Sequence, residues 1–215
     1  MSERSDRNPG RPRRPAMLDP RDLESQPGHL DPAEVSEAAH QTAAVLVGRG
    51  RAAQDPEITR RLVTLVDELG MATVADLWAD RPAVSLPGAL WRLYTLREWV
   101  QRAPVDAAKD YEEGRLHADA PHVVAGAAEP PTPEAVKAMS DSILTGVFDG
   151  DLAVALDRAA AFCQVVSVGR AHRADEREMT DARGAAAQTV SASALLTTAR
   201  DLTRAAALWR AGRLE

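Results

Sequence analysis

The chain has 215 residues, of which 45% are hydrophobic and 27% are charged, so it suits one ordinary packed domain with tails. A formal net charge of −6 argues against a protein that binds a polyanion over its whole surface, although a local basic patch stays open. The single cysteine, Cys163, excludes an internal disulfide and a cysteine-rich zinc site, and its apolar helical surroundings predict a buried structural thiol.

Residues 1–30 are predicted to form a disordered tail. They combine Pro, Gly, Ser and charged side chains with almost no apolar ones, so they cannot bury enough surface to offset the entropy lost on ordering. The first part of the tail is basic, and Arg11, Arg13 and Arg14 are its candidate contact residues. Such a run can touch nucleic acid or an acidic partner, but a solubilising tail with no specific partner is the favoured interpretation.

Helix start and stop signals divide the first half of the chain. Asp31 and Pro32 start a helix that we expect to end near Val47, where the sequence GRG follows. The same start signal at Asp55 predicts a helix that ends at Gly70. The apolar face of this second helix is predicted to consist of Ile58, Leu62, Leu65, Val66 and Leu69.

A short helix is predicted at about 73–79, with Val74, Leu77 and Trp78 together on one side. Further helices are predicted at 86–102 and, for one or two turns weakened by Gly114, at 105–116. A Pro-containing connective stretch then follows. It is a candidate boundary between two lobes, 31–116 and 132–170, of a helical domain that spans 31–170.

Two N-cap residues, Thr132 and Asp151, start helices that a very short turn joins into a hairpin over 133–168. Their expected core residues are Val136, Met139, Ile143 and Val147 in the first helix, and Leu152, Leu156, Phe162, Cys163 and Val166 in the second. Residues 171–190 are predicted to be a polar linker, and 191–215 to carry a C-terminal helix. Because no segment alternates with the period of a half-buried strand, we predict an all-α bundle of about six to eight helices.

The segment LWRLYTLREWV, residues 90–100, concentrates aromatic and basic side chains on one helix. Leu86, Leu90, Leu93, Val100 and Trp91 can form a broad apolar face there, so packing into a core is the first interpretation. The helix is also a candidate contact surface, with exposed Arg as steering charges and any exposed Trp as an anchor. Its candidate interaction residues are Trp91, Arg92, Arg97, Trp99 and Arg102.

Residues 57–102 admit a second interpretation, a helix-turn-helix-like unit whose last helix would enter the major groove of DNA. Arginine on that helix would then contact guanine edges or phosphates. The link between the last two helices is longer than the usual tight turn, and two Trp on a reading helix are better explained by packing. DNA binding through this unit therefore stays the alternative hypothesis.

Histidines and carboxylates crowd together in the sequence YEEGRLHADAPH, where they could ligate a divalent metal or support acid–base chemistry. A helical di-metal site needs Glu-x-x-His on two helices, whereas Glu113 and His117 are four residues apart and have no second copy. No metal or other cofactor is therefore favoured, and the cluster is interpreted as a solvated helix end. The metal-ligand candidates, with a metal-dependent enzyme as the third hypothesis, are Glu113, His117, Asp119 and His122. His29, His40 and His172 are interpreted as isolated surface residues.

The segments LPGALWRLYTLREWV and SILTGVFDGDLAVALDRAAAFC, rich in Ala and Arg and poor in Lys, are typical of proteins from high-GC actinobacteria. Over about residues 40–168 the chain is similar to an actinobacterial helical family associated with the label "DNA-directed RNA polymerase subunit beta". The chain is too short for that catalytic subunit and lacks its metal-binding carboxylate motif. The resemblance therefore implies a transcription-associated accessory protein.

Taken together, these patterns favour a non-enzymatic helical interaction or regulatory protein. Another protein is the favoured partner, nucleic acid is the alternative, and the oligomeric state is left open. No run of about 18 uncharged apolar residues predicts a membrane span, and no apolar stretch after the Arg-rich start suits a signal peptide. We therefore expect a cytoplasmic protein with no membrane partner.

Overall fold

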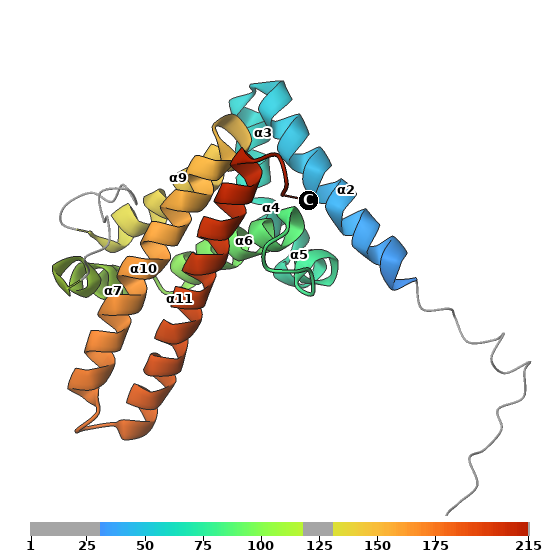
Figure 1. The fold of residues 1–215 in the computed structure, drawn as a ribbon. Helices are drawn as coiled ribbons and strands as arrows, with labels where there is room; N and C mark the ends of the chain where they lie inside the picture. The colour runs from blue at the N-terminus through green and yellow to red at the C-terminus, as the bar shows by residue number, and fades with distance from the viewer. Residues whose placement is uncertain (1–30, 118–130, 215) are drawn as a thin grey trace, which may run out of the picture. The chain divides into compact units, whose positions relative to one another are not determined.

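The structure, a computed structural model, describes residues 31–117 and 131–214, and these residues form nine helices and no strand (Figure 1). The predicted all-α fold is confirmed, and the chain from Ala33 onward is one compact unit. The predicted tail over 1–30, with Arg11, Arg13 and Arg14, lies outside the described residues. The helices are α2 (Pro32–Ala53), α3 (Pro56–Val63), α4 (Leu65–Leu69), α5 (Met71–Trp78), α6 (Leu86–Arg102), α7 (Pro104–His117), α9 (Pro133–Asp149), α10 (Leu152–Arg177) and α11 (Ala182–Arg210).

The longest helices, α10 and α11, form an antiparallel hairpin (Figure 1). Small side chains are buried along both of them. Buried small residues recur every seven positions on both helices, which is the spacing of a coiled-coil seam. They are Ala153, Ala160, Ser167 and Ala174 on α10, and Ala185, Ala192, Ala199 and Ala206 on α11. Ser167 also donates a buried hydrogen bond of 2.7 Å to the carbonyl of Ala192, which ties the two helices together.

The polar linker predicted over 171–190 is wrong, because α10 continues to Arg177 and α11 begins at Ala182. Only residues 178–181 lie between the two helices. Asp181 caps α11 by accepting a hydrogen bond from the amide of Gly184 and pairs with Arg177 across the turn. The sequence reads as polar here because Ala supplies the contact face of the hairpin while charged residues cover the rest.

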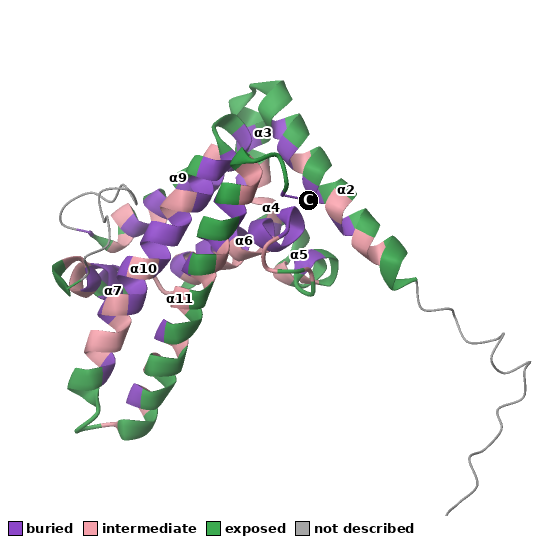
Figure 2. Ribbon diagram, viewed as in Figure 1, coloured by how far each residue is buried: buried purple, intermediate pink, exposed green. Residues whose placement is uncertain are grey.

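Helix α10 lies at the centre of the core and runs past α6, α7 and α9 as well as α11 (Figure 2). All five of its predicted core residues are fully buried. Among the described residues it is the one helix with the length and mean hydropathy, 1.4, to cross a membrane, yet 72% of that apolar window is buried inside the protein. Burial against other helices accounts for its apolar character. Burial also raises the pKa of the Cys163 thiol to about 12.

The predicted bounds of α6 are confirmed, and so is the predicted cap of α9 at Thr132; Ser85 caps α6 in the same way. The hydroxyls of Ser85 and Thr132 accept hydrogen bonds from the amides three residues ahead, at Gly88 and Ala135. The predicted core residues of α9 are all buried. α7 is longer than the one or two turns expected over 105–116, because it starts at Pro104 and runs for 14 residues.

The N-terminal helices depart from the prediction in two places. α2 does not end near Val47 but continues to Ala53, because Gly50 is a packing position: a Cβ there would lie 3.0 Å from side-chain atoms of Leu62 and Phe148. The helix predicted from Asp55 to Gly70 is interrupted at Thr64, which divides it into α3 and α4. Its predicted apolar face is also partly wrong, because two of its members, Ile58 and Leu69, are 39% and 51% exposed.

Two glycines allow α7 to cross α10 at backbone contact distance. A Cβ on Gly114 would lie 1.8 Å from the carbonyl oxygen of Val165, and a Cβ on Gly169 would lie 1.8 Å from that of Asp110. No residue other than glycine fits such an approach without displacing a helix. Gly114 was expected to weaken a helix, whereas the structure uses it as the point where two helices touch.

Candidate functional site

The aromatic and basic residues of α6 are largely committed to contacts within the protein. Trp91 and Trp99 are half-buried against the core, Trp99 lies beside Phe162, and the Arg170 guanidinium lies 4.6 Å from the centre of the Trp99 ring. Arg92 donates to the carbonyl of Gly88 at 3.1 Å and pairs with Asp201 of α11. The first interpretation of this segment, packing into a core, describes most of these contacts.

Arg97 is the most buried of the three arginines on α6, with 8% of its side chain exposed. Its Nε donates to Asp141 on α9 at 2.7 Å, and its Nη1 donates to Asp67 on α4 at 3.3 Å. Arg102 is instead 71% exposed and pairs with Glu98 one turn back on the same helix. Of the arginines proposed as steering charges, Arg102 therefore offers the most exposed guanidinium.

The burial of α6 side chains also bears on the hypothesis that residues 57–102 bind DNA through this helix. A recognition helix must present one face to the major groove. In α6, ten of the 17 residues are buried, and both the Arg92 and Arg97 side chains are paired within the chain. This arrangement argues against α6 as a reading helix, and DNA binding stays an untested prediction.

An apolar groove of about 390 Å³ opens between α2, α4 and α5. Its rim carries three large hydrophobic side chains that are exposed to solvent, Val45 at 48%, Leu69 at 51% and Leu77 at 39%. Its floor is formed by Val74 and Trp78, which are both buried. Single exposed hydrophobic residues are ordinary on a protein surface, but here three of them surround one depression.

The polar groups that line the groove are already bonded within the chain. The Thr42 hydroxyl donates to the carbonyl of Ala38 at 2.8 Å and accepts from the Trp78 indole N–H at 3.4 Å. The Gln41 amide donates to Glu37 at 2.7 Å. A small polar ligand needs a few convergent polar groups to fix its orientation. The groove therefore suits an apolar surface rather than a polar metabolite.

The surroundings of the groove are acidic on the side of α4 and α5. The segment from Leu65 to Asp80 contains four carboxylates and no Lys or Arg. Two of them are paired within the chain, Asp67 with Arg97 and Glu68 with Arg61. The other two, Asp76 and Asp80, are exposed on the helix that carries Leu77 and at its C-terminal end.

The groove was not predicted from the sequence because two of its exposed members, Leu69 and Leu77, were assigned to apolar helix faces. Leu69 was placed with the apolar face of one helix, and Leu77 with Val74 and Trp78 of the next. The break at Thr64 and the change of direction at Gly70, which has φ 84°, turn these residues outward. Gly70 was recognised as a helix end, but the sequence did not give the direction of the chain after it.

A larger cavity, of about 740 Å³, lies between α2 and the C-terminal end of the chain, beside Trp209 and Leu214. Its lining mixes apolar side chains with the polar residues Ser36, Glu37, His40 and Arg51. Two of these are engaged along α2, since Glu37 accepts from Gln41 and His40 Nδ1 faces the carbonyl of Ser36.

The histidine and carboxylate cluster expected after α6 is only partly as predicted. Glu113 and His117 lie together near the end of α7, with the His117 Nε2 2.9 Å from the Glu113 Oε1. Asp119 and His122 lie outside the described residues. Glu112 pairs with Arg115 instead of joining the cluster.

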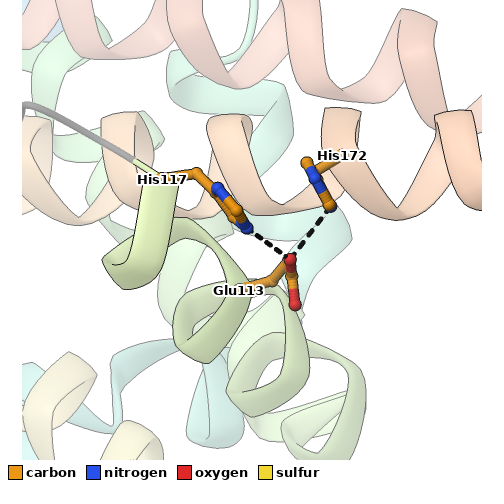
Figure 3. A group of neighbouring side chains, drawn as sticks. All are labelled: Glu113, His117 and His172. Atoms are coloured by element: carbon orange, nitrogen blue, oxygen red, sulfur yellow. Dashed lines mark ion pairs between the residues drawn. The ribbon is translucent and has the colours of Figure 1, made fainter.

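The prediction that His172 is isolated is wrong. Its ring stacks on that of His117 at 4.1 Å between centroids, and its Nδ1 is 2.9 Å from the same Glu113 Oε1 (Figure 3). His172 is 55 residues from His117, so only the crossing of α7 and α10 brings them together. The one sequence feature that could have indicated this contact is the position of His172, three residues after Gly169, which is one of the two glycines at the helix crossing.

No family model, curated protein or solved structure matches this chain. The resemblance to an actinobacterial family stays a prediction, together with the transcription-associated role that it implies.

Proposed function

We propose that this chain acts without catalysis, by binding another protein through the apolar groove between α2, α4 and α5. The observation that carries the proposal is the convergence of exposed Val45, Leu69 and Leu77 on a groove whose polar lining is already satisfied. Recognition of an amphipathic helix in a hydrophobic groove requires apolar anchors and few directed polar contacts.

The proposed occupant is an amphipathic helix of the partner with Lys or Arg beside its apolar face. Apolar anchors at positions i, i+3 or i+4, and i+7 would contact the groove, since these positions share one face of a helix. We infer a basic flank because Asp76 and Asp80 are exposed on and beside α5. Complementary charge raises the association rate and selects among partners. The groove chemistry selects no class of partner beyond this, so the transcription-associated role is left as a prediction.

The direct test is binding of a labelled model peptide, a Leu-anchored amphipathic helix with Lys flanks, to the full-length protein by fluorescence anisotropy. Leu69→Gln together with Leu77→Gln is expected to reduce affinity at least about tenfold, because two apolar anchors of the groove are lost. Both side chains are substantially exposed, so the double variant is expected to fold.

Val190→Gln is the matched control, because Val190 is 71% exposed on α11, away from the groove. It is expected to leave the affinity unchanged. The proposal is wrong if the wild-type protein does not bind the peptide, or if Val190→Gln weakens binding as much as the double variant does. Self-association that the double variant abolishes would put a second copy of the chain in the groove and would overturn the assignment to a different partner.

A further inference from the structure

The cluster formed by Glu113, His117 and His172 lies outside the apolar groove and has no part in the function proposed above. One carboxylate oxygen of Glu113 faces a ring nitrogen of each histidine at 2.9 Å (Figure 3). One ligand atom from each residue can be chosen so that all three lie within 4.8 Å of one another. Two imidazoles and a carboxylate are thus gathered at a single point on the surface where α7 crosses α10.

The position of these side chains is fixed by the helices beneath them. Glu113 precedes the crossing residue Gly114, and His172 lies three residues, or nearly one helical turn, after Gly169. One turn before Glu113, the carboxylate of Asp110, 3% exposed, accepts from Arg170 at 2.8 Å and from Arg173. This buried ion network fastens α7 to α10 directly beside the cluster, so the three side chains are held on a rigid base.

The cluster contains a polar atom that the chain does not satisfy. His172 Nδ1 is buried and has no hydrogen-bond partner among the described residues, because Glu113 Oε1 lies close to it without the geometry of a hydrogen bond. A buried nitrogen left without a partner is unfavourable.

A divalent cation would give this nitrogen a partner. A metal ion bonds neutral imidazole nitrogens and a carboxylate oxygen at once, and it keeps both rings deprotonated. Two histidines and one carboxylate are a common ligand set for Zn²⁺ and neighbouring transition metals, whereas Mg²⁺ and Ca²⁺ prefer oxygen ligands. Tetrahedral bonds of about 2.0 Å set ligand atoms about 3.3 Å apart, so modest side-chain rotation closes the observed cluster around an ion.

We propose that Glu113, His117 and His172 form a binding site for one divalent transition-metal ion of the zinc class. The side chains are 25%, 43% and 41% exposed, so the remaining coordination positions face solvent and take water. Because two ligands come from α7 and one from α10, the ion acts as a clamp on the helix crossing.

The proposal is tested by isothermal titration of the untagged, EDTA-treated full-length protein with Zn²⁺ alone at pH 7.5. One ion is expected to bind per chain and to raise the thermal unfolding temperature, since a ligand that binds the folded state stabilises it. Replacing a ligand by His172→Gln is expected to lower the affinity about 100-fold or more, because changes in the groups around metal ligands already cost about 10–100-fold. Glu113→Gln is expected to weaken binding as well.

His40→Ala is the matched control, since His40 is a half-buried histidine on α2 whose Nδ1 faces the carbonyl of Ser36. It should bind Zn²⁺ as the wild type does. An unchanged unfolding temperature of His172→Gln in EDTA separates loss of a ligand from loss of fold. The site is refuted if the wild type does not bind Zn²⁺, if His172→Gln binds as tightly, or if half an ion binds per chain with dimer formation, which would place the site between copies.

Discussion

Substituting Gly169→Ala tests the helix crossing that supports the whole core. The added Cβ would lie 1.8 Å from the Asp110 carbonyl oxygen and 2.4 Å from the Gly114 amide nitrogen. The first distance is about 1.6 Å short of the 3.4 Å at which ordinary contact begins, and both obstacles are backbone atoms that cannot rotate away. α7 must therefore move, and such overpacking costs about 3 kcal/mol. Alanine in place of glycine returns about 1 kcal/mol through helix propensity, which leaves a net loss of about 2 kcal/mol.

Gly48→Ala is the matched control, because Gly48 lies inside α2 with no atom within 4 Å of the position that a Cβ would take. The same chemical change there is expected to stabilise the protein by up to about 1 kcal/mol. Urea unfolding followed by circular dichroism measures both free energies. If Gly169→Ala proves as stable as the wild type, α7 and α10 do not approach each other at backbone contact distance, and the reasoning behind the histidine cluster loses its base.

Three further predictions concern two buried groups, Arg97 and Cys163. Arg97→Ala is expected to lower the free energy of unfolding by about 1.5–3 kcal/mol, because charge-assisted hydrogen bonds to Asp141 and Asp67 are lost. Arg102→Ala removes only an exposed ion pair and should change the free energy of unfolding by less than about 0.5 kcal/mol. Equal losses for the two variants in urea unfolding would contradict the buried, paired position of Arg97. Burial raises the pKa of Cys163 from 9.0 to about 12, so the folded protein keeps this proton longer than the unfolded chain does. The stability that this thiol contributes is complete below about pH 9 and falls as pH rises from there toward 12, a fall that Cys163→Ala should reduce. In native protein at pH 8 the Cys163 thiol should resist iodoacetamide and react only after unfolding in urea. If the folded protein is alkylated as rapidly as the unfolded protein, the thiol is not buried.

Much of the fold could be predicted because helix starts carry local chemical signals. Asp55 before Pro56, Thr132 before Pro133, and Asp151 each accept a hydrogen bond from a backbone amide of the first turn, and these bonds need no tertiary partner. Helix ends were harder to predict. Glycine commonly ends a helix, but Gly50 and Gly114 lie inside helices, where another part of the chain packs against them. Composition alone does not show that contact.

The candidate sites were less predictable because they depend on separate segments. Glu113 and His117 share a helix and were found, whereas His172 is brought to them by a crossing between helices that are far apart in sequence. Likewise, the apolar spacing of Leu69 and Leu77 predicted buried faces, and only the turn at Gly70 directs them outward. The seven-residue recurrence of alanine in α11 was readable in the sequence and would have replaced the predicted linker with a helix.

That alanine recurrence leaves the alignment of α10 against α11 undetermined by apolar contact alone. A slip of one helix along the other by seven residues, about 10 Å, would again set small side chains opposite small side chains. The short turn at residues 178–181 opposes such a slip. So does the ion pair between Arg210 and Asp157, because the residues seven positions away, Thr203 on α11 and Gly150 or Gln164 on the side of Asp157, carry no charge. In this hairpin the uniform apolar seam supplies close packing, and the turn and a charged pair select one alignment from several that pack equally well.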